Sequence, residues 1–238
     1  PSYVPLLHRA YELWWALERE VAERLLVLTG SFDIGTEESL VFGGALQAAR
    51  LHQLVHEVLT PVEIRRRFPG YALTAPLLGL YQPQGGLLAA ERCIVAHVQA
   101  ALRCGATMHG REALAGWDSS GGGVVVRTAR GTYRAQRLVL TAGAWMPQLL
   151  ASYRGIMQPE RQVVVWMQPR TPAYFQVDTF PVFNMAVEEG QFYGLPVYSI
   201  PGFKLARWHH LEQTVDAPAA LDRACHPEDE AIVRARVR

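Results

Sequence analysis

The sequence predicts an α+β fold, in which an antiparallel or mixed sheet is flanked by helices. Half of the 238 residues are hydrophobic, which is enough for a sizeable core. Apolar residues recur at helical spacing in several segments of the first hundred residues. The second half instead contains short apolar runs bounded by glycine and proline, which are typical of strands.

Helices and strands alternate in the first half. We expect helices at residues 3–21, 38–55, 60–69 and 89–105, and strands at 24–35, 56–60, 77–83 and 106–110. Thr60 is the expected N-cap of the third helix and Pro61 its first residue, a position that proline favours. Gly105 is expected to end the fourth helix, as glycine commonly does.

The second half is predicted to be mostly strand. We expect two strands around a turn at residues 129–131, a buried strand at 138–141 and a helix at 146–153. Further strands are expected at residues 161–169, on both sides of a turn at Glu189-Gly190, and at 203–210. A polar connection then leads into a last helix, within residues 226–238.

Composition excludes several classes of function. The net charge is +1 and no basic stripe stands out, so nucleic-acid binding has no electrostatic support. No apolar run approaches the roughly 20 residues that a membrane span needs, and no signal peptide is recognisable. The three cysteines lack CxxC spacing, which indicates reduced thiols in a cytoplasmic protein. The opening proline and the abrupt last helix suggest an internal fragment of a longer protein.

Motif searches for cofactor and metal sites give negative results. The sequence contains neither GxGxxG nor GxxxxGK[ST], so no phosphate-binding loop is expected within it. His209 and His210 are adjacent, and neighbouring side chains on a strand point to opposite faces. They are therefore a poor metal pair, and we expect no metal. One of them could face a cleft and act as a base or orienting group; the alternative is a polar strand end.

Tyr193 and Lys204 form the best candidate constellation. They fall on neighbouring predicted strands, each within apolar sequence. A phenol and an ammonium in such surroundings need partners or a ligand. The alternative for Lys204 is a side chain whose ammonium reaches water along an apolar surface.

Six segments in order resemble the monomeric sarcosine oxidase and N-methyltryptophan oxidase family, which consists of FAD-dependent amine oxidases related to D-amino-acid oxidase. The segments span nearly the whole chain: "YVPLLHRAYELWWALE", "GGLLAAERCIVAH", "GTYRAQRLVLTAGAW", "RQVVVW", "FYGLP" and "GFKLARWHHLEQTVDAPAALDRACHPEDEA". Each is weak alone, but the ordered set with matching spacings is specific.

The resemblance implies a Rossmann-type FAD domain and a substrate domain built on an antiparallel sheet. Residues 1–75 and 155–225 would then form the substrate domain, 76–154 partial elements of the FAD domain, and 226–238 a truncated helix. The family's GxGxxG motif would lie before Pro1 and its covalent flavin cysteine beyond Arg238. This chain alone is therefore expected to be inactive.

The resemblance also implies a reaction and its partners. The family oxidises a secondary or primary amine, such as sarcosine or another N-methyl or small amino acid, to an imine, and oxygen is reduced to hydrogen peroxide. The expected partners are this small-molecule amine and molecular oxygen, and the protein is expected to be a monomer. A glycine-oxidase-like or dehydrogenase-like role stays open, as does a non-catalytic binding or scaffold module that has lost flavin.

Catalytic roles are carried over by position. Tyr193 matches an active-site tyrosine near the substrate, and Lys204 matches the lysine that promotes oxygen activation. A fixed cation suits that role, because it stabilises the negative charge that develops on oxygen. The family's active-site histidine comes four positions after the lysine, where this sequence has Trp208. His209 is therefore the candidate for the histidine role.

Two further assignments concern substrate and cofactor. Met185 resembles a methionine of the substrate cleft, with a core methionine as the alternative. The segment "TAGAW" resembles the place where the FAD-domain backbone approaches the cofactor, which suits small residues. The expected cofactor-binding residues are Ala142, Gly143, Ala144 and Trp145.

Overall fold

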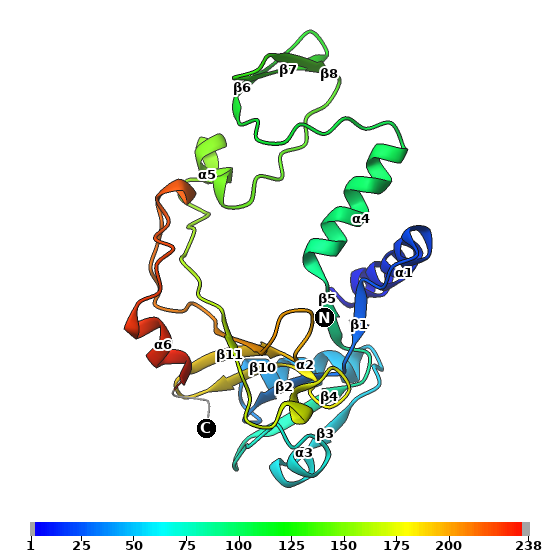
Figure 1. Ribbon diagram of the computed structural model, residues 1–238, viewed down its shortest axis with the longest axis vertical. Coiled ribbons are helices and arrows are strands. Elements are labelled where there is room, and N and C mark those ends of the chain that lie inside the picture. Colours follow the sequence, from blue (N-terminus) through cyan, green and yellow to red (C-terminus); the bar gives the residue numbers. More distant parts are fainter. Residues whose placement is uncertain (1–2, 235–238) are drawn as a thin grey trace. The chain divides into compact units, whose positions relative to one another are not determined.

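The structure is a computed structural model that describes residues 3–234 of the chain. It divides into two compact units. The first contains residues 3–100, 162–210 and 225–234, and the second contains residues 101–161 and 211–224. Each unit is therefore assembled from segments that lie far apart in the sequence (Figure 1).

A seven-stranded sheet forms the centre of the first unit, in the order β3-β4-β2-β10-β11-β12-β9. Strands β2 and β10 pair in parallel, and the other neighbours are antiparallel, so the sheet is mixed. This confirms the α+β class. The strands are β2 (Ser31–Gly35), β3 (Glu57–Leu59), β4 (Leu78–Gln82), β9 (Val165–Met167), β10 (Val182–Val187), β11 (Gly190–Leu195) and β12 (Phe203–Arg207).

Helices flank this sheet, and a separate two-stranded sheet pairs β1 (Leu26–Leu28) with β5 (Gly86–Leu88). Leu17 of the first helix packs with Ala96 of the fourth in one buried cluster. Among the described residues, no helix has the length and apolarity needed to cross a membrane. The helices are α1 (Val4–Val21), α2 (Leu40–Leu51), α3 (Pro61–Arg67), α4 (Ala90–Arg103) and α6 (Pro227–Arg234).

The two faces of the seven-stranded sheet have different coverings. On one face, Phe32 and Ile34 of β2 pack with Ile64 of α3 in a buried cluster. On the other face, Phe42 of α2 packs on Leu80 of β4. Alternate residues of each strand serve the two faces, as the pleat requires. We call the second face, which α2 covers at β4, β2 and β10, the α2 face.

The second unit is built around a three-stranded antiparallel sheet, in the order β6-β7-β8. Its strands are β6 (Leu114–Ser120), β7 (Gly123–Thr128) and β8 (Thr132–Ala135). Helix α5 (Met146–Leu149) and a 3₁₀ turn at Gly143–Trp145 follow in sequence. The predicted hairpin around residues 129–131 is thus confirmed.

Three strand predictions were wrong. The run at residues 24–35 forms two strands in different sheets, because Gly30 breaks it with a left-handed φ of +73°. No strand forms at residues 106–110 or 138–141. A strand needs a hydrogen-bonded partner, and among the described strands none pairs with either segment; Val139 is 79% exposed there.

The compact units divide the chain differently from the expected substrate and FAD domains, whose limits stay a prediction. Strand β4 begins at Leu78, after the expected boundary at residue 75, yet it pairs with β2 and β3 inside the central sheet of the first unit. The predicted last helix is present as α6, Pro227–Arg234. Residues 235–238 of that prediction lie outside the described residues.

The start of α3 is fixed by a capping box. Thr60 Oγ1 accepts from the backbone N–H of Glu63, and the Glu63 carboxylate accepts from Thr60 N at 2.8 Å. We expect Thr60→Ala to lower the free energy of unfolding by about 1 kcal/mol. Thr171 is the matched control, since it caps a short 3₁₀ helix without a side-chain bond. Equal losses in urea denaturation of Thr60→Ala and Thr171→Ala would contradict this account.

Candidate active site

Lys204 lies on the α2 face because its neighbours on β12 belong to the opposite face. Phe203 and Leu205 are 6% and 4% exposed and pack with Val233 of α6. Strand alternation therefore turns Lys204 the other way. Strand β12 is hydrogen-bonded on both sides, to β11 and to β9, so the lysine backbone is held firmly. Lys204 is also the only lysine among the 238 residues.

Tyr193 shares this face with Lys204, and the structure confirms that the two lie on neighbouring antiparallel strands. Tyr193 of β11 is opposite Ala206 of β12. Lys204 lies two residues before Ala206 on β12, so its side chain is on the same face as Ala206 and Tyr193. The Lys204 ammonium lies 5.8 Å from the centre of the Trp166 ring on β9. Burial raises the pKa of the Tyr193 phenol above its ordinary value. The phenol therefore stays protonated near neutral pH and can donate a hydrogen bond.

Trp208 occupies the position four residues after Lys204 and packs against Tyr193. The ring centres are 5.3 Å apart and the rings are tilted by 54°. Strand β12 ends at Arg207, so Trp208 and His209 belong to a turn. His209 is exposed and has a left-handed φ of +50°. The Trp208 indole therefore packs beside the Tyr193 phenol, at the position where members of the resembling family have a histidine.

His210 is fully buried and has a structural setting. Its Nε2 lies 2.9 Å from Asp229 Oδ1, and the other Asp229 oxygen accepts from the backbone N–H of His226 at the start of α6. Since an ionised carboxylate only accepts, Nε2 carries the hydrogen. Arg207 Nη1 donates to the His210 carbonyl at 2.6 Å. These bonds tie the end of β12 to α6.

Three polar side chains on the α2 face were missed by the sequence analysis. Asp33 of β2 pairs with Asn184 of β10, which pairs with Tyr193 of β11. Gln191 Nε2 donates to Asn184 Oδ1 at 2.8 Å, and the Asn184 side chain hydrogen-bonds the Asp33 carboxyl. The alternation of polar and apolar residues in "SFDIG" was a usable signal, but it did not show which strand lies beside β2.

Met185 does not share the face of Tyr193. It pairs with Phe192 and lies in the apolar cluster around Phe32, on the other side of the sheet. Because successive side chains alternate, Asn184 is the residue opposite Tyr193. The structure therefore does not bring Met185 together with Tyr193 and Lys204, and it favours the core alternative for this methionine.

The predicted cofactor segment, Ala142, Gly143, Ala144 and Trp145, belongs to the second unit. Gly143 has a φ of +52°, and a Cβ added there would meet nothing within 4 Å. Trp145 is 52% exposed. An open backbone of small residues fits close approach by a planar cofactor, and the cofactor-binding role of this segment stays a prediction.

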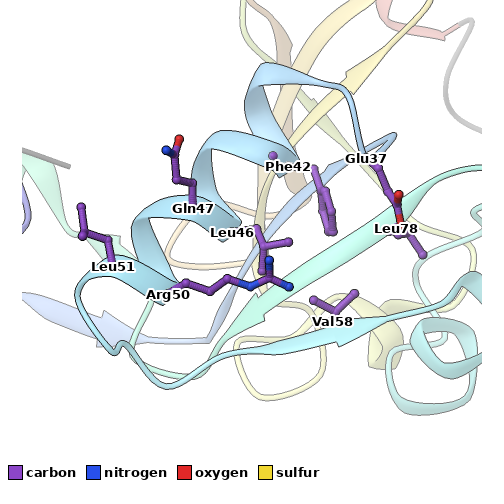
Figure 2. Close-up of a pocket in the computed structure, with 9 residues that line it drawn as sticks. Glu37, Phe42, Leu46, Gln47, Arg50, Leu51, Val58 and Leu78 are labelled. Atoms are coloured by element: carbon purple, nitrogen blue, oxygen red, sulfur yellow. The ribbon is translucent and has the colours of Figure 1, made fainter.

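The groove shown in Figure 2 lies at the other end of the sheet. It has a volume of about 850 Å³ and lies between α2 and the strands β3 and β4, of which β3 is at the edge of the sheet. Phe42 and Leu46 point from the helix toward the sheet, while Arg50 extends along the groove above Val58. Four strands separate β3 from β12 in the sheet order, so this groove is not part of the Lys204 site.

Comparison with known proteins identifies relatives along nearly the whole chain. Residues 1–233 match the family described as FAD dependent oxidoreductase. The chain is 38% identical over 233 residues to monomeric sarcosine oxidase of Streptomyces avermitilis, covering 96% of this chain and 60% of that protein. It is 28% identical over 219 residues to N-methyl-L-tryptophan oxidase of Yersinia pestis, covering 92% of this chain and 58% of that protein.

A solved structure agrees with the fold. The open form of NikD, an amino acid oxidase essential for nikkomycin biosynthesis, superposes with a TM-score of 0.73 at 23% identity, covering 94% of this chain and 59% of that one. The chain spans about 60% of the length of the curated relatives it matches. The family match over residues 1–233 confirms the resemblance found in the sequence, and the chain belongs to the family of FAD-dependent oxidoreductases.

Proposed function

We propose that this chain carries the substrate face of an FAD-dependent oxidase that converts a secondary or primary amine to an imine. The proposed substrates are sarcosine, another N-methyl amino acid or a small amino acid, with oxygen as the electron acceptor. The observation that carries the proposal is the shared face of Tyr193 and Lys204, beside two exposed tryptophans, in a chain of this family.

The chain's own residues fit a planar cofactor and a small amine. Lys204, Tyr193 and the faces of Trp166 and Trp208 combine a cation, a phenol and aromatic surface on one side of the sheet. The chemistry that FAD supplies when bound is removal of a hydride equivalent from the carbon beside the amine and delivery of two electrons to oxygen. The imine then takes up water, for example to give glycine and formaldehyde from sarcosine.

Lys204 provides the charge in this proposal and Tyr193 orients the substrate. An ammonium fixed on a central strand stabilises negative charge that develops on oxygen without having to reorganise. The protonated phenol of Tyr193 donates a hydrogen bond to the substrate, and Trp208 limits the movement of its ring. His209, in the turn that follows β12, is proposed as an acid–base group.

A peroxide-coupled screen of amines tests the proposal. The protein expressed from its complete gene is offered sarcosine, N-methyltryptophan, proline and glycine. We expect at least one to yield hydrogen peroxide in a 1:1 ratio with substrate consumed. A protein that shows no flavin absorbance and no peroxide with any of them would contradict the proposal and favour a non-catalytic module.

The contact between Trp208 and Tyr193 gives a second test. Aromatic pairs of this kind contribute about 0.5–1.5 kcal/mol, so we expect Trp208→Ala to raise KM by about 3- to 10-fold with little change in kcat. Trp208→Phe, which keeps an aromatic ring, is the control. A loss of kcat with an unchanged KM would contradict a packing role for Trp208.

His209→Ala, measured beside these variants, separates the imidazole from the indole. A fall in kcat assigns His209 an acid–base role. Unchanged kcat and KM would contradict that role and leave Tyr193 as the proton-holding group of this face.

A further inference from the structure

Asp33 ends a line of polar side chains that crosses the α2 face and takes no part in the chemistry described above. Asp33, Asn184 and Tyr193 are register partners on three successive strands. The hydrogen bond from Gln191 occupies the Asn184 oxygen, so the Asn184 amide nitrogen is the group that bonds the Asp33 carboxyl. The amides are therefore oriented to donate toward a single acid at the end of the line.

The pKa of the Asp33 carboxyl shows no contribution from a neighbouring cation. Burial raises the pKa of the Asp33 carboxyl to about 6, and the hydrogen bond from Asn184 lowers the pKa by a smaller amount. No charged side chain of β4, β10 or α2, within the described residues, contributes to this shift. A carboxylate accepts about four hydrogen bonds, and a cation beside it would offset the cost of its burial.

The distances along the face suit a substrate with two polar ends. Neighbouring strands lie about 4.8 Å apart, so the backbone of Asp33 is about 10 Å from that of Tyr193 and about 14 Å from β12. Lys204 makes the β12 end positive, and Asp33 makes the β2 end negative. A second cation on an amine substrate would be repelled by Lys204 and attracted by Asp33.

We propose that Asp33, oriented by Asn184, binds a second cationic group of the substrate, an ammonium or guanidinium, so that the preferred substrate is a diamine or a basic N-methyl amino acid. This inference rests on the proposed function, because the reacting amine has to lie over Tyr193 and Lys204. Asp33 is a specificity-determining residue in this account and takes no part in the bond-breaking step.

Three substrates test the subsite with the complete, flavin-containing protein: sarcosine, Nα-methyl-L-lysine and Nα-methyl-L-norleucine, which lacks the distal ammonium. We expect kcat/KM for the lysine derivative to exceed that for the norleucine derivative by about 10-fold or more, the usual effect of a hydrogen bond to a charged group. Asp33→Asn is expected to abolish this preference and to change sarcosine oxidation by less than about 3-fold. Asp178→Asn, in an exposed loop, is the matched control and should change neither value.

Calorimetric binding of 1,5-diaminopentane gives a readout independent of oxidation. Affinity in the wild type should rise as pH rises through about 6, because the carboxyl is protonated below its pKa and charged above it. Asp33→Asn should bind about 10-fold more weakly, with a flat pH profile over this range. The wild-type comparisons need no variant, so they decide the matter even if Asp33→Asn fails to fold.

The outcomes separate the two proposals. If sarcosine is oxidised but the lysine derivative is not preferred and diamine binding does not change with pH, the subsite is overturned and the oxidase function stands. If no amine is oxidised while diamine binding rises through pH 6, the oxidase function is overturned and the cation subsite stands. If the wild type shows neither activity nor pH-dependent binding, both are overturned.

Discussion

Replacing Lys204 with methionine is expected to slow reoxidation of the bound flavin by oxygen about 100- to 1000-fold, the usual cost of removing one preorganised electrostatic group. Flavin reduction by substrate should change by less than about 5-fold, because removal of a hydride equivalent from the carbon beside the amine builds no negative charge on oxygen. The Lys204 backbone is held on β12, which pairs with β11 and β9, and Phe203 and Leu205 pack on the other face. Stopped-flow absorbance measures the two half-reactions separately.

Two variants control for the loss of charge. Lys204→Arg keeps a cation and should retain much of the oxygen reaction, although a guanidinium distributes its charge more widely than an ammonium. Arg170→Met removes the same charge from an exposed position just after β9 and should affect neither half-reaction. Equal slowing of both half-reactions by Lys204→Met, or of neither, would refute the oxygen-activating role.

Removal of the buried His210 imidazole is expected to lower the free energy of unfolding by about 3 kcal/mol, because breaking a buried pair leaves the Asp229 carboxylate without one of its donors. The pair joins the end of β12 to the first turn of α6. Chemical denaturation of His210→Ala measures this loss. Turnover per folded, flavin-containing molecule should stay close to that of the wild type.

The neighbouring His209 supplies a matched control. It is exposed, whereas His210 has no exposed surface. His209→Ala should therefore change the free energy of unfolding by less than about 0.5 kcal/mol, as is usual for surface positions. Equal destabilisation by the two variants would show that the His210–Asp229 pair is not a special support of the fold.

The alternation of polar and apolar residues predicted the part of the site that lies on the β10–β11 hairpin and on the adjacent strand β12. In "FKLAR" the apolar residues around Lys204 already indicate which face the lysine avoids, and the short turn after β10 makes β10 and β11 neighbours. Counting along that hairpin also places Asn184 or Ala186 opposite Tyr193. In both cases Met185, which lies between these two residues, points to the opposite face. Strand alternation alone could therefore have corrected its assignment.

Asp33 could not be placed from the sequence, because its partner strand is distant. Strand β2 pairs in parallel with β10, about 150 residues later, and no local signal specifies that register. The segment around Val139 shows the opposite problem. Its apolar residues predicted a strand, but a strand depends on a partner, and none of the described strands supplies one.

The most direct test of the proposed substrate face is a crystal structure of the complete protein with FAD and (methylthio)acetate, in which sulfur replaces the sarcosine nitrogen. We expect the ligand on the α2 face, within hydrogen-bond reach of the Tyr193 hydroxyl, and the flavin ring beside the Lys204 ammonium. A ligand bound on the opposite face of the sheet, against Met185 and Phe203, would contradict the account.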